Sequence, residues 1–279
     1  MAAPDYVLVG HITRDVVPDG YTVGGTVTYA GLTASRLGRR VGVLTSAGPD
    51  LDIAAALPGI ELAVVPAEAT TTFENTYQAG HRRQYLRAVA GQILAEHVPP
   101  AWRAAPIVHF APLAQEFGTS LLGAFPGAWL RGLTPQGWLR QWDSSGLVRR
   151  VASPTLNGAL SRLDVVVLSE EDVDGDWDVL RGYAATASLL VATQGAGGAT
   201  LCQRERCAAY PAFQAAAEVD PTGAGDVFAA AFLIRLSETG DPHEATVFAN
   251  CVASFAVEGT GTSTLPDLDQ VLARRRGAG

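Results

Sequence analysis

The segment DPTGAGDVFAAAF, residues 220–232, places a glycine-rich turn directly before a run of small and apolar residues that is typical of a buried helix. The first-turn amides of a helix have no intrahelical partners, and they lie at the positive end of the helix dipole. We therefore expect the backbone at Gly223, Ala224 and Gly225 to form an anion hole that a phosphate group can approach closely.

Asp226 is the acidic residue of this turn, and it is the residue that we expect to perform chemistry. At the start of a helix, a carboxylate often serves only as a cap for backbone amides. Beside a phosphate group it can instead accept the proton of an attacking hydroxyl, as a general base does. The turn by itself leaves both interpretations open.

Strand-like and helical segments alternate along most of the chain. Continuous apolar runs, of which 164–168 and 188–193 are the clearest, are typical of strands that are buried on both faces. The expected strands cover 6–10, 41–46, 107–110, 164–168 and 188–193, and the expected helices cover 26–37, 224–238 and 242–257. This alternation predicts an α/β protein, a three-layer α/β/α sandwich around a mostly parallel central sheet.

Two segments depart from this alternation. Residues 70–90 have the pattern of a polar β-hairpin with Gly80 near its turn, and residues 12–24 are similarly extended. Together they predict a small β-sheet that covers a site as a lid. An ordinary surface hairpin is the alternative.

Composition limits the class of protein. The 279 residues are 48% hydrophobic and 17% charged, which suits a single domain over 1–279. A net charge of −8 disfavours a nucleic-acid partner, and no apolar run approaches the roughly 20 residues of a membrane span. All 20 basic residues are Arg, so a Schiff-base lysine and a Walker-type phosphate loop are excluded. Bound phosphates would depend on backbone amides, Arg and a metal ion.

The three cysteines are Cys202, Cys207 and Cys251. Their odd, sparse number argues against a disulfide framework and suits a cytoplasmic protein.

The segment around Asp226 resembles the Asp-Thr-Gly-Ala-Gly-Asp signature of the ribokinase-like (PfkB) carbohydrate kinases, and the resemblance extends in the right order over nearly the whole chain. It implies a ribokinase-like fold and an ATP-dependent kinase that phosphorylates a hydroxyl of a small sugar or polyol. It also implies Asp226 as the catalytic base, Mg²⁺ as a cofactor, and a monovalent cation in some relatives. An open lid sheet in this family often pairs with a second subunit, which implies a homodimer.

The resemblance also assigns residues to the acceptor. Asp15 falls where family members bind substrate hydroxyls, and a carboxylate suits a vicinal diol because it can accept two hydrogen bonds. Gly24 and Gly25 match the di-glycine motif, whose backbone approaches the substrate. Arg83 falls where lid arginines occur, although a solvated hairpin charge is equally compatible with its position.

On the donor side, Thr193, Gly195 and Gly198 match the nucleotide-binding segment of the family. A dinucleotide-binding loop is disfavoured here, because a strand rather than a helix is expected over 199–202. Asn250 falls where family members place a residue near the adenine, while a polar position on a helix face is the alternative.

Two positions depart from the family pattern. Tyr29 stands where many members have Asn, and an aromatic ring suits a ring face better than a sugar hydroxyl. Asp172 stands where the family has a Glu that organises Mg²⁺ through water, and an acidic first helical turn is the alternative. Tyr29, together with 71–75 and 135–140, resembles the myo-inositol kinase-like branch. A nucleoside kinase, with Tyr29 stacked on a base, and a catalytically idle nucleotide-binding protein are the remaining alternatives.

Overall fold

The computed structural model of the chain describes residues 3–78, 81–204 and 206–277. The helices are α1 (Thr26–Arg36), α2 (Ile53–Ala56), α3 (Pro154–Ala159), α4 (Trp177–Thr186), α5 (Ala224–Thr239), α6 (Pro242–Ala256) and α7 (Leu268–Gly277). The strands are β1 (Tyr6–Val9), β2 (Thr13–Val17), β3 (Gly20–Gly24), β4 (Val41–Ala47), β5 (Glu61–Pro66), β6 (Thr71–Gln78), β7 (His81–Ala88), β8 (Ile107–Phe110), β9 (Leu130–Leu133), β10 (Arg140–Trp142), β11 (Val148–Arg150), β12 (Val165–Ser169), β13 (Leu189–Thr193), β14 (Ala199–Gln203) and β15 (Arg206–Tyr210). Three 3₁₀ turns near the site are η4 (Gln136–Leu139), η6 (Glu170–Val173) and η7 (Gly195–Gly197).

A nine-stranded sheet forms the centre of the molecule, in the order β15-β14-β13-β12-β9-β8-β1-β4-β5. Its pairs are parallel from β13 to β5, and β14 and β15 extend it as an antiparallel hairpin. Along β1, Tyr6 and Leu8 pack into one core and Val7 and Val9 into the other, because successive side chains of a strand point to opposite faces. The continuous apolar runs of the sequence therefore mark strands buried on both sides, as predicted.

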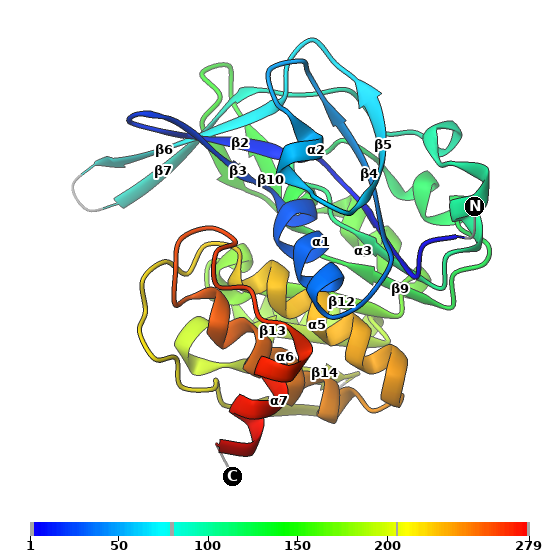
Figure 1. The fold of residues 1–279 in the computed structure, drawn as a ribbon, viewed down its shortest axis with the longest axis vertical. Helices are drawn as coiled ribbons and strands as arrows, with labels where there is room; N and C mark the ends of the chain where they lie inside the picture. Colours follow the sequence, from blue (N-terminus) through cyan, green and yellow to red (C-terminus); the bar gives the residue numbers. More distant parts are fainter. Residues whose placement is uncertain (1–2, 79–80, 205, 278–279) are drawn as a thin grey trace.

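Helices cover both faces of this sheet. The helices α1, α5, α6 and α7 lie on one face, in front of the sheet in Figure 1, and α3 and α4 lie on the other. The predicted three-layer α/β/α sandwich is confirmed. Within the described residues, the longest and most apolar helices still fall short of what a membrane crossing requires.

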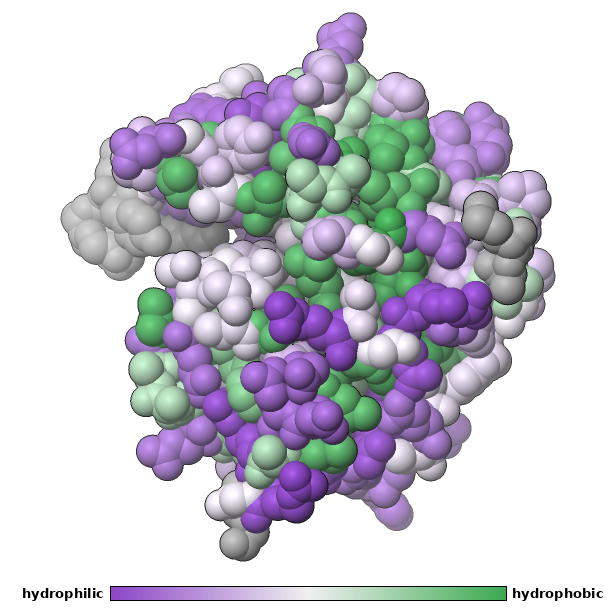
Figure 2. Space-filling view, in the orientation of Figure 1, coloured by the Kyte–Doolittle hydropathy of each residue, from purple (hydrophilic) through white to green (hydrophobic). Residues whose placement is uncertain are grey.

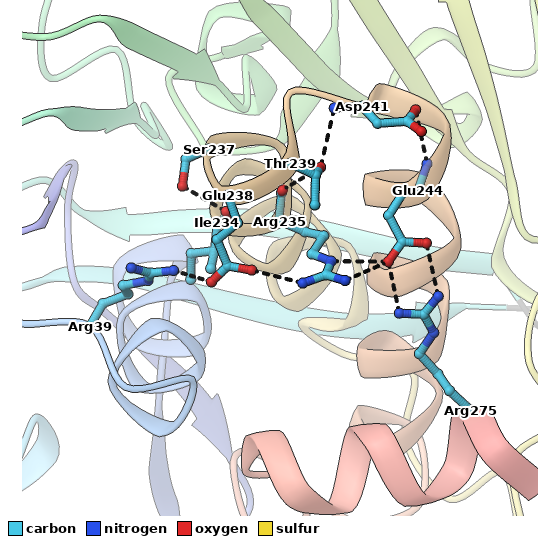
Figure 3. Close-up of polar contacts among 9 residues, drawn as sticks. All are labelled: Arg39, Ile234, Arg235, Ser237, Glu238, Thr239, Asp241, Glu244 and Arg275. Atoms are coloured by element: carbon cyan, nitrogen blue, oxygen red, sulfur yellow. Dashed lines mark hydrogen bonds and ion pairs between the residues drawn. The ribbon is translucent and has the colours of Figure 1, made fainter.

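Ion pairs tie the helices of the front layer together (Figure 3). Glu244 of α6 accepts from Arg235 of α5 at 2.8 Å and from Arg275 of α7 at 2.8 and 2.9 Å. Arg235 also reaches Glu238, which pairs with Arg39 just after α1. Hydrophilic side chains accordingly cover much of the surface in front of these helices (Figure 2).

The extended segments form a second, four-stranded sheet in the order β3-β2-β6-β7, and its β6–β7 hairpin projects from the body (Figure 1). The predicted small sheet is therefore present; its expected turn at Gly80 lies outside the described residues. The β10–β11 hairpin packs against it, with Trp142 and Val148 against Phe73 and Leu86. These contacts attach the small sheet to the segment that follows η4.

Buried polar groups join the two sheets. The imidazole of His11 hydrogen-bonds to the Thr71 hydroxyl at 2.7 Å and to the Gly91 carbonyl at 2.9 Å, while its backbone N–H donates to Glu116 at 2.8 Å. His11, Thr71 and Glu116 are fully buried. We call His11, Thr71, Gly91 and Glu116 the root network, because β2, β6 and β7 all enter or leave the small sheet beside it.

Cys202 and Cys207 form a disulfide, with their Cα atoms 4.1 Å apart. The expectation drawn from the odd cysteine number is therefore wrong for this pair. The register of β14 and β15 sets the two residues directly opposite each other, which a count of cysteines does not reveal. Cys251 is free and buried in α6. The prediction of a cytoplasmic location loses the support that it drew from the cysteines.

Candidate active site

The glycine-rich turn adopts the conformation that its sequence requires. Gly223, the residue before α5, has a φ of 81°, a left-handed value that suits glycine. The N–H of Thr222 donates to Asp220 Oδ1 at 2.9 Å, and the N–H of Ala224 donates to the Pro221 carbonyl at 3.2 Å. These bonds fix the turn, and the amides of Gly225 and Asp226 belong to the first helical turn, which lacks intrahelical acceptors.

Tyr29 of α1 packs directly against this turn. A Cβ atom built on Gly223 would lie 2.3 Å from Cδ1 of the Tyr29 ring. Burial, aided by the negative charges of Asp15, Asp226 and Asp220, raises the pKa of Tyr29 to about 12. The phenol therefore stays protonated at neutral pH and lies within the electrostatic reach of both the predicted base and the predicted acceptor residue.

The environment of Asp226 suits a general base. Removal from water raises the pKa of Asp226 to about 6, and the charge of Asp172 adds to the rise. A hydrogen bond from the Thr26 side chain and the charge of Arg140 act in the opposite direction. A carboxylate with this pKa is ionised at pH 7 and is a stronger base than an ordinary Asp.

On the acceptor side, Asp15 and the two glycines come together. A Cβ atom on Gly24 would lie 2.1 Å from Asp15 Oδ2, so the carboxylate lies against the backbone of Gly24. Gly25 precedes α1 with a φ of 88°, and a Cβ atom there would lie 2.7 Å from the His11 carbonyl. Arg83 is exposed on β7, opposite Thr76. Its contact with a substrate stays a prediction.

The predicted donor-side segment begins beside the start of α5. Thr193 ends β13, and its Oγ1 would be 4.0 Å from a Cβ atom on Gly225. Gly195 begins η7 with a φ of 52°, and Gly198 follows η7 with a φ of 91°. A Cβ atom on Gly198 would lie 2.1 Å from the Tyr210 carbonyl, so only glycine fits there.

Asn250 of α6 forms hydrogen bonds to the backbone of Tyr210 and Pro211, against which Gly198 packs. Its side-chain amide donates to the carbonyls of Tyr210 at 3.2 Å and of Pro211 at 3.0 Å, and the residue is 5% exposed. Asn250 and Gly198 thus order one segment, directly after β15. Contact of Asn250 with a bound adenine stays a prediction.

The predicted metal residue lies at the end of β12. Asp172 Oδ2 accepts from the Ser169 N–H at 3.0 Å, and Oδ1 lies 3.5 Å from Gln136 Nε2. Among the described residues, no group of three His, Cys, Asp or Glu side chains could hold a metal ion directly. Mg²⁺ often keeps several waters and uses one or two carboxylates, so Asp172 near Asp226 fits a water-mediated site.

Two residues of this region were not among the predicted site residues. Thr26 bonds to Asp226 from the first turn of α1, directly after the di-glycine pair. Arg140 lies at the start of β10, and its guanidinium carbon lies 5.8 Å from the centre of the Phe73 ring. The resemblance of 135–140 to the inositol-kinase branch was the signal that could have identified Arg140.

The known proteins whose sequences resemble this chain are kinases of small molecules. Residues 175–268 match the pfkB family carbohydrate kinases. A nucleoside kinase of Methanocaldococcus jannaschii is 32% identical over 93 residues, which span 33% of this chain and only 31% of that relative. A cytidine kinase of Thermococcus kodakarensis is 26% identical over 266 residues, which span 87% of this chain and 92% of that relative.

Solved structures extend the likeness to the whole fold. A pyrophosphate-dependent kinase in the ribokinase family, complexed with a pyrophosphate analogue and myo-inositol, has a TM-score of 0.79 at 23% identity, covering 96% of this chain and 99% of that one. The ribokinase of Arabidopsis thaliana complexed with ribose and ATP has a TM-score of 0.74 at 21% identity, covering 98% of each chain. The predicted ribokinase-like fold is confirmed.

Proposed function

This chain carries a PfkB family carbohydrate kinase domain, and we propose that it is an ATP-dependent kinase for a hydroxyl of a small polyhydroxylated acceptor, either a sugar or a cyclitol such as myo-inositol. Kinases of this family are phosphotransferases with hydroxyl acceptors. The observation that supports the proposal best is the position of Asp226. Its carboxylate has a pKa raised to about 6 and lies in the first turn of α5, where backbone amides can hold a phosphate.

The reaction follows from this arrangement. Asp15 and the backbone of Gly24 and Gly25 hold the acceptor, so that one hydroxyl faces Asp226. That hydroxyl oxygen forms a bond to the γ-phosphorus as the bond from the γ-phosphorus to the β–γ bridging oxygen breaks. The hydroxyl proton passes to Asp226, and ADP leaves with the electron pair of the broken bond. The amides of the α5 turn stabilise the charge on the transferring group.

Several other residues support the donor side. Thr193 lies beside the start of α5, Gly195 and Gly198 would receive the nucleotide in the turn that follows it, and Asn250 orders the backbone against which Gly198 packs. Mg²⁺, when bound, neutralises phosphate charge, and Asp172 would hold it through water. Because one structural neighbour is a pyrophosphate-dependent kinase, pyrophosphate belongs beside ATP in any donor test.

The small sheet is proposed to be a lid of the single domain over 1–279. Its root network lies beside Gly25, and its strand β2 supplies Asp15, so closure would bring the acceptor to the base and exclude water. Its exposed apolar residues Val16, Val17 and Tyr21, each 37–39% exposed, also suit pairing with a second copy of the chain.

A nucleoside is the second candidate acceptor. Two curated relatives are a nucleoside kinase and a cytidine kinase. Tyr29 offers little ring surface to a base, because it is 5% exposed and packs against Gly223. The same burial withholds the ring from a sugar or cyclitol, so we place that acceptor first only because the matching family model describes carbohydrate kinases.

The test is a transfer assay with inositols, ketoses, aldoses and nucleosides, with ATP or pyrophosphate as donor, in which the phosphorylated product is measured. Asp226→Asn is the matched variant. Turnover on one class of acceptor that is lost in the variant would establish the kinase and its substrate. Donor binding without product across the whole panel would support an idle kinase fold, and turnover retained in the variant would remove Asp226 as the base.

A further inference from the structure

We infer that Arg140 is a catalytic residue whose guanidinium contacts the transferring phosphoryl group, opposite the amides of the α5 turn. This inference rests on the proposed kinase function. It identifies Arg140 as the source of a full positive charge in a protein that contains no lysine.

The position of Arg140 places it on the acceptor side of the site. Its guanidinium carbon lies 5.8 Å from the centre of the Phe73 ring. Phe73 of β6 is the direct partner of Asp15 in the parallel β2–β6 pair. Arg140 therefore lies beside the strand pair that carries the predicted acceptor carboxylate.

Arg140 is also linked to the predicted base, Asp226, and its chain neighbours to the predicted metal residue, Asp172. Its charge acts on Asp226 across the site. The turn η4, which directly precedes Arg140, carries Gln136, whose side-chain amide lies 3.5 Å from Asp172 Oδ1. Arg140 thus lies beside the strand partner of Asp15, acts electrostatically on Asp226, and directly follows the turn whose Gln136 approaches Asp172.

The backbone of Arg140 is held firmly. Its carbonyl accepts a hydrogen bond from the side chain of Gln115, and β10 pairs with β11 through Arg140 opposite Arg150. Gln115 itself has a φ of 57°, an uncommon conformation for a residue other than glycine. Strained backbone of this kind persists only where its surroundings hold it, and it is concentrated at functional sites.

The chemistry requires such a cation. Charge in the transition state spreads over the three equatorial oxygens of the phosphoryl group, and backbone amides supply only partial charges against it. A guanidinium is always protonated and presents a planar set of donors that matches two phosphate oxygens. Arg140 would supply this charge within one chain, as an arginine finger does.

The test compares Arg140→Met and Arg140→Lys with Arg149→Met, an exposed arginine in the neighbouring strand β11. We expect Arg140→Met to lower kcat by about 10³-fold with little change in the acceptor KM, and Arg140→Lys to recover part of the loss. Arg149→Met should match the wild type. Circular dichroism and thermal melting establish that each variant is folded.

The pH profile separates a catalytic role from a structural one. The groups that act on Asp226 are Thr26, Asp172 and Arg140, and removing the cation should shift the acid limb of kcat to higher pH. A folded Arg140→Met variant with kcat within threefold of the wild type, or with an unmoved acid limb, would overturn the inference and leave the kinase proposal intact.

If the wild-type protein shows no turnover, the proposed kinase function is wrong. Binding of inorganic tripolyphosphate, measured by calorimetry, then still tests Arg140. At least tenfold weaker binding by Arg140→Met than by Arg149→Met is the expected result, and equal affinity would overturn the inference.

Discussion

The ring of Tyr29 lies against Gly223, so that any Cβ atom at position 223 would lie 2.3 Å from Cδ1 of that ring. The first helix after the di-glycine pair therefore supports the turn that begins α5. Because Gly223 also has a φ of 81°, two independent constraints exclude a side chain there. The shape of the proposed anion hole would therefore depend on both residues.

Gly223→Ala should damage both stability and catalysis. We expect the left-handed backbone and the contact with Tyr29 together to lower the free energy of unfolding by about 2–4 kcal/mol. Displacement of the turn should lower kcat by at least about 100-fold, because first-turn amides act only when they are positioned. Thermal melting and the transfer assay measure the two effects.

Gly240→Ala is the matched control. Gly240 ends α5 with a φ of 66°, and no heavy atom lies within 4 Å of a Cβ atom built there. It should lose about 1 kcal/mol of stability and retain full turnover. Equal kcat for the Gly223 and Gly240 variants would contradict the proposed anion hole.

The turnover rate should fall in acid with a midpoint near pH 6. Asp226 must be ionised to accept a proton, and burial raises its pKa to about 6. Below this value kcat should fall about tenfold for each pH unit, since one proton inactivates the base. A profile that stays flat to pH 4.5, recorded where the protein remains folded, would exclude Asp226 as the titrating base.

Asp226→Asn should stabilise the protein at neutral and higher pH. The pKa of Asp226 rises from 3.8 to about 6 in the fold, so the folded state holds this proton more tightly than the unfolded state. The buried charge therefore lowers stability above pH 6, by up to about 3 kcal/mol, and this penalty disappears as the pH falls below 4. Denaturant unfolding at pH 8 and at pH 4 should show a gain for the variant at pH 8 alone.

Asn250→Asp should impair the use of ATP. A carboxylate cannot donate to the carbonyls of Tyr210 and Pro211, so the segment after β15 would lose its order. We expect the KM for ATP to rise about tenfold, the effect of roughly 1.4 kcal/mol, with a smaller change in kcat. Asn157→Asp, an exposed position of α3, is the control. An unchanged KM for ATP would show that Asn250 does not contribute to ATP binding.

The sequence predicts the central sheet well, because strands buried on both faces are continuous apolar runs. The β12 and β13 strands and the helices α5 and α6 lie within two residues of their expected bounds. Strands with weaker patterns were not predicted. In β9 an Arg and a Gly interrupt the apolar residues, and β10 and β11 have three residues each. The β5 strand was also missed, although its residues 62–65 are all apolar.

The candidate site is predictable where it depends on local sequence. Asp226, Gly223 and the donor-side glycines lie in short segments whose conformation follows from their own residues. Arg140 and Thr26 are different, because their relation to Asp226 depends on how separate elements pack. The Cys202–Cys207 pair similarly depends on the register of a hairpin, which the spacing of cysteines does not specify.

The root network has a mechanical consequence. His11 contacts Thr71 and Gly91 through its ring and approaches Gly25 through its carbonyl, so every passage of the chain between the two sheets meets at this one buried residue. A movement that separated His11 from Thr71 or Gly91 would break buried hydrogen bonds, which is unfavourable without water to replace them. If the small sheet moves as the proposed lid, its four strands would therefore move as one rigid unit about His11, and Asp15 of β2 would move with them.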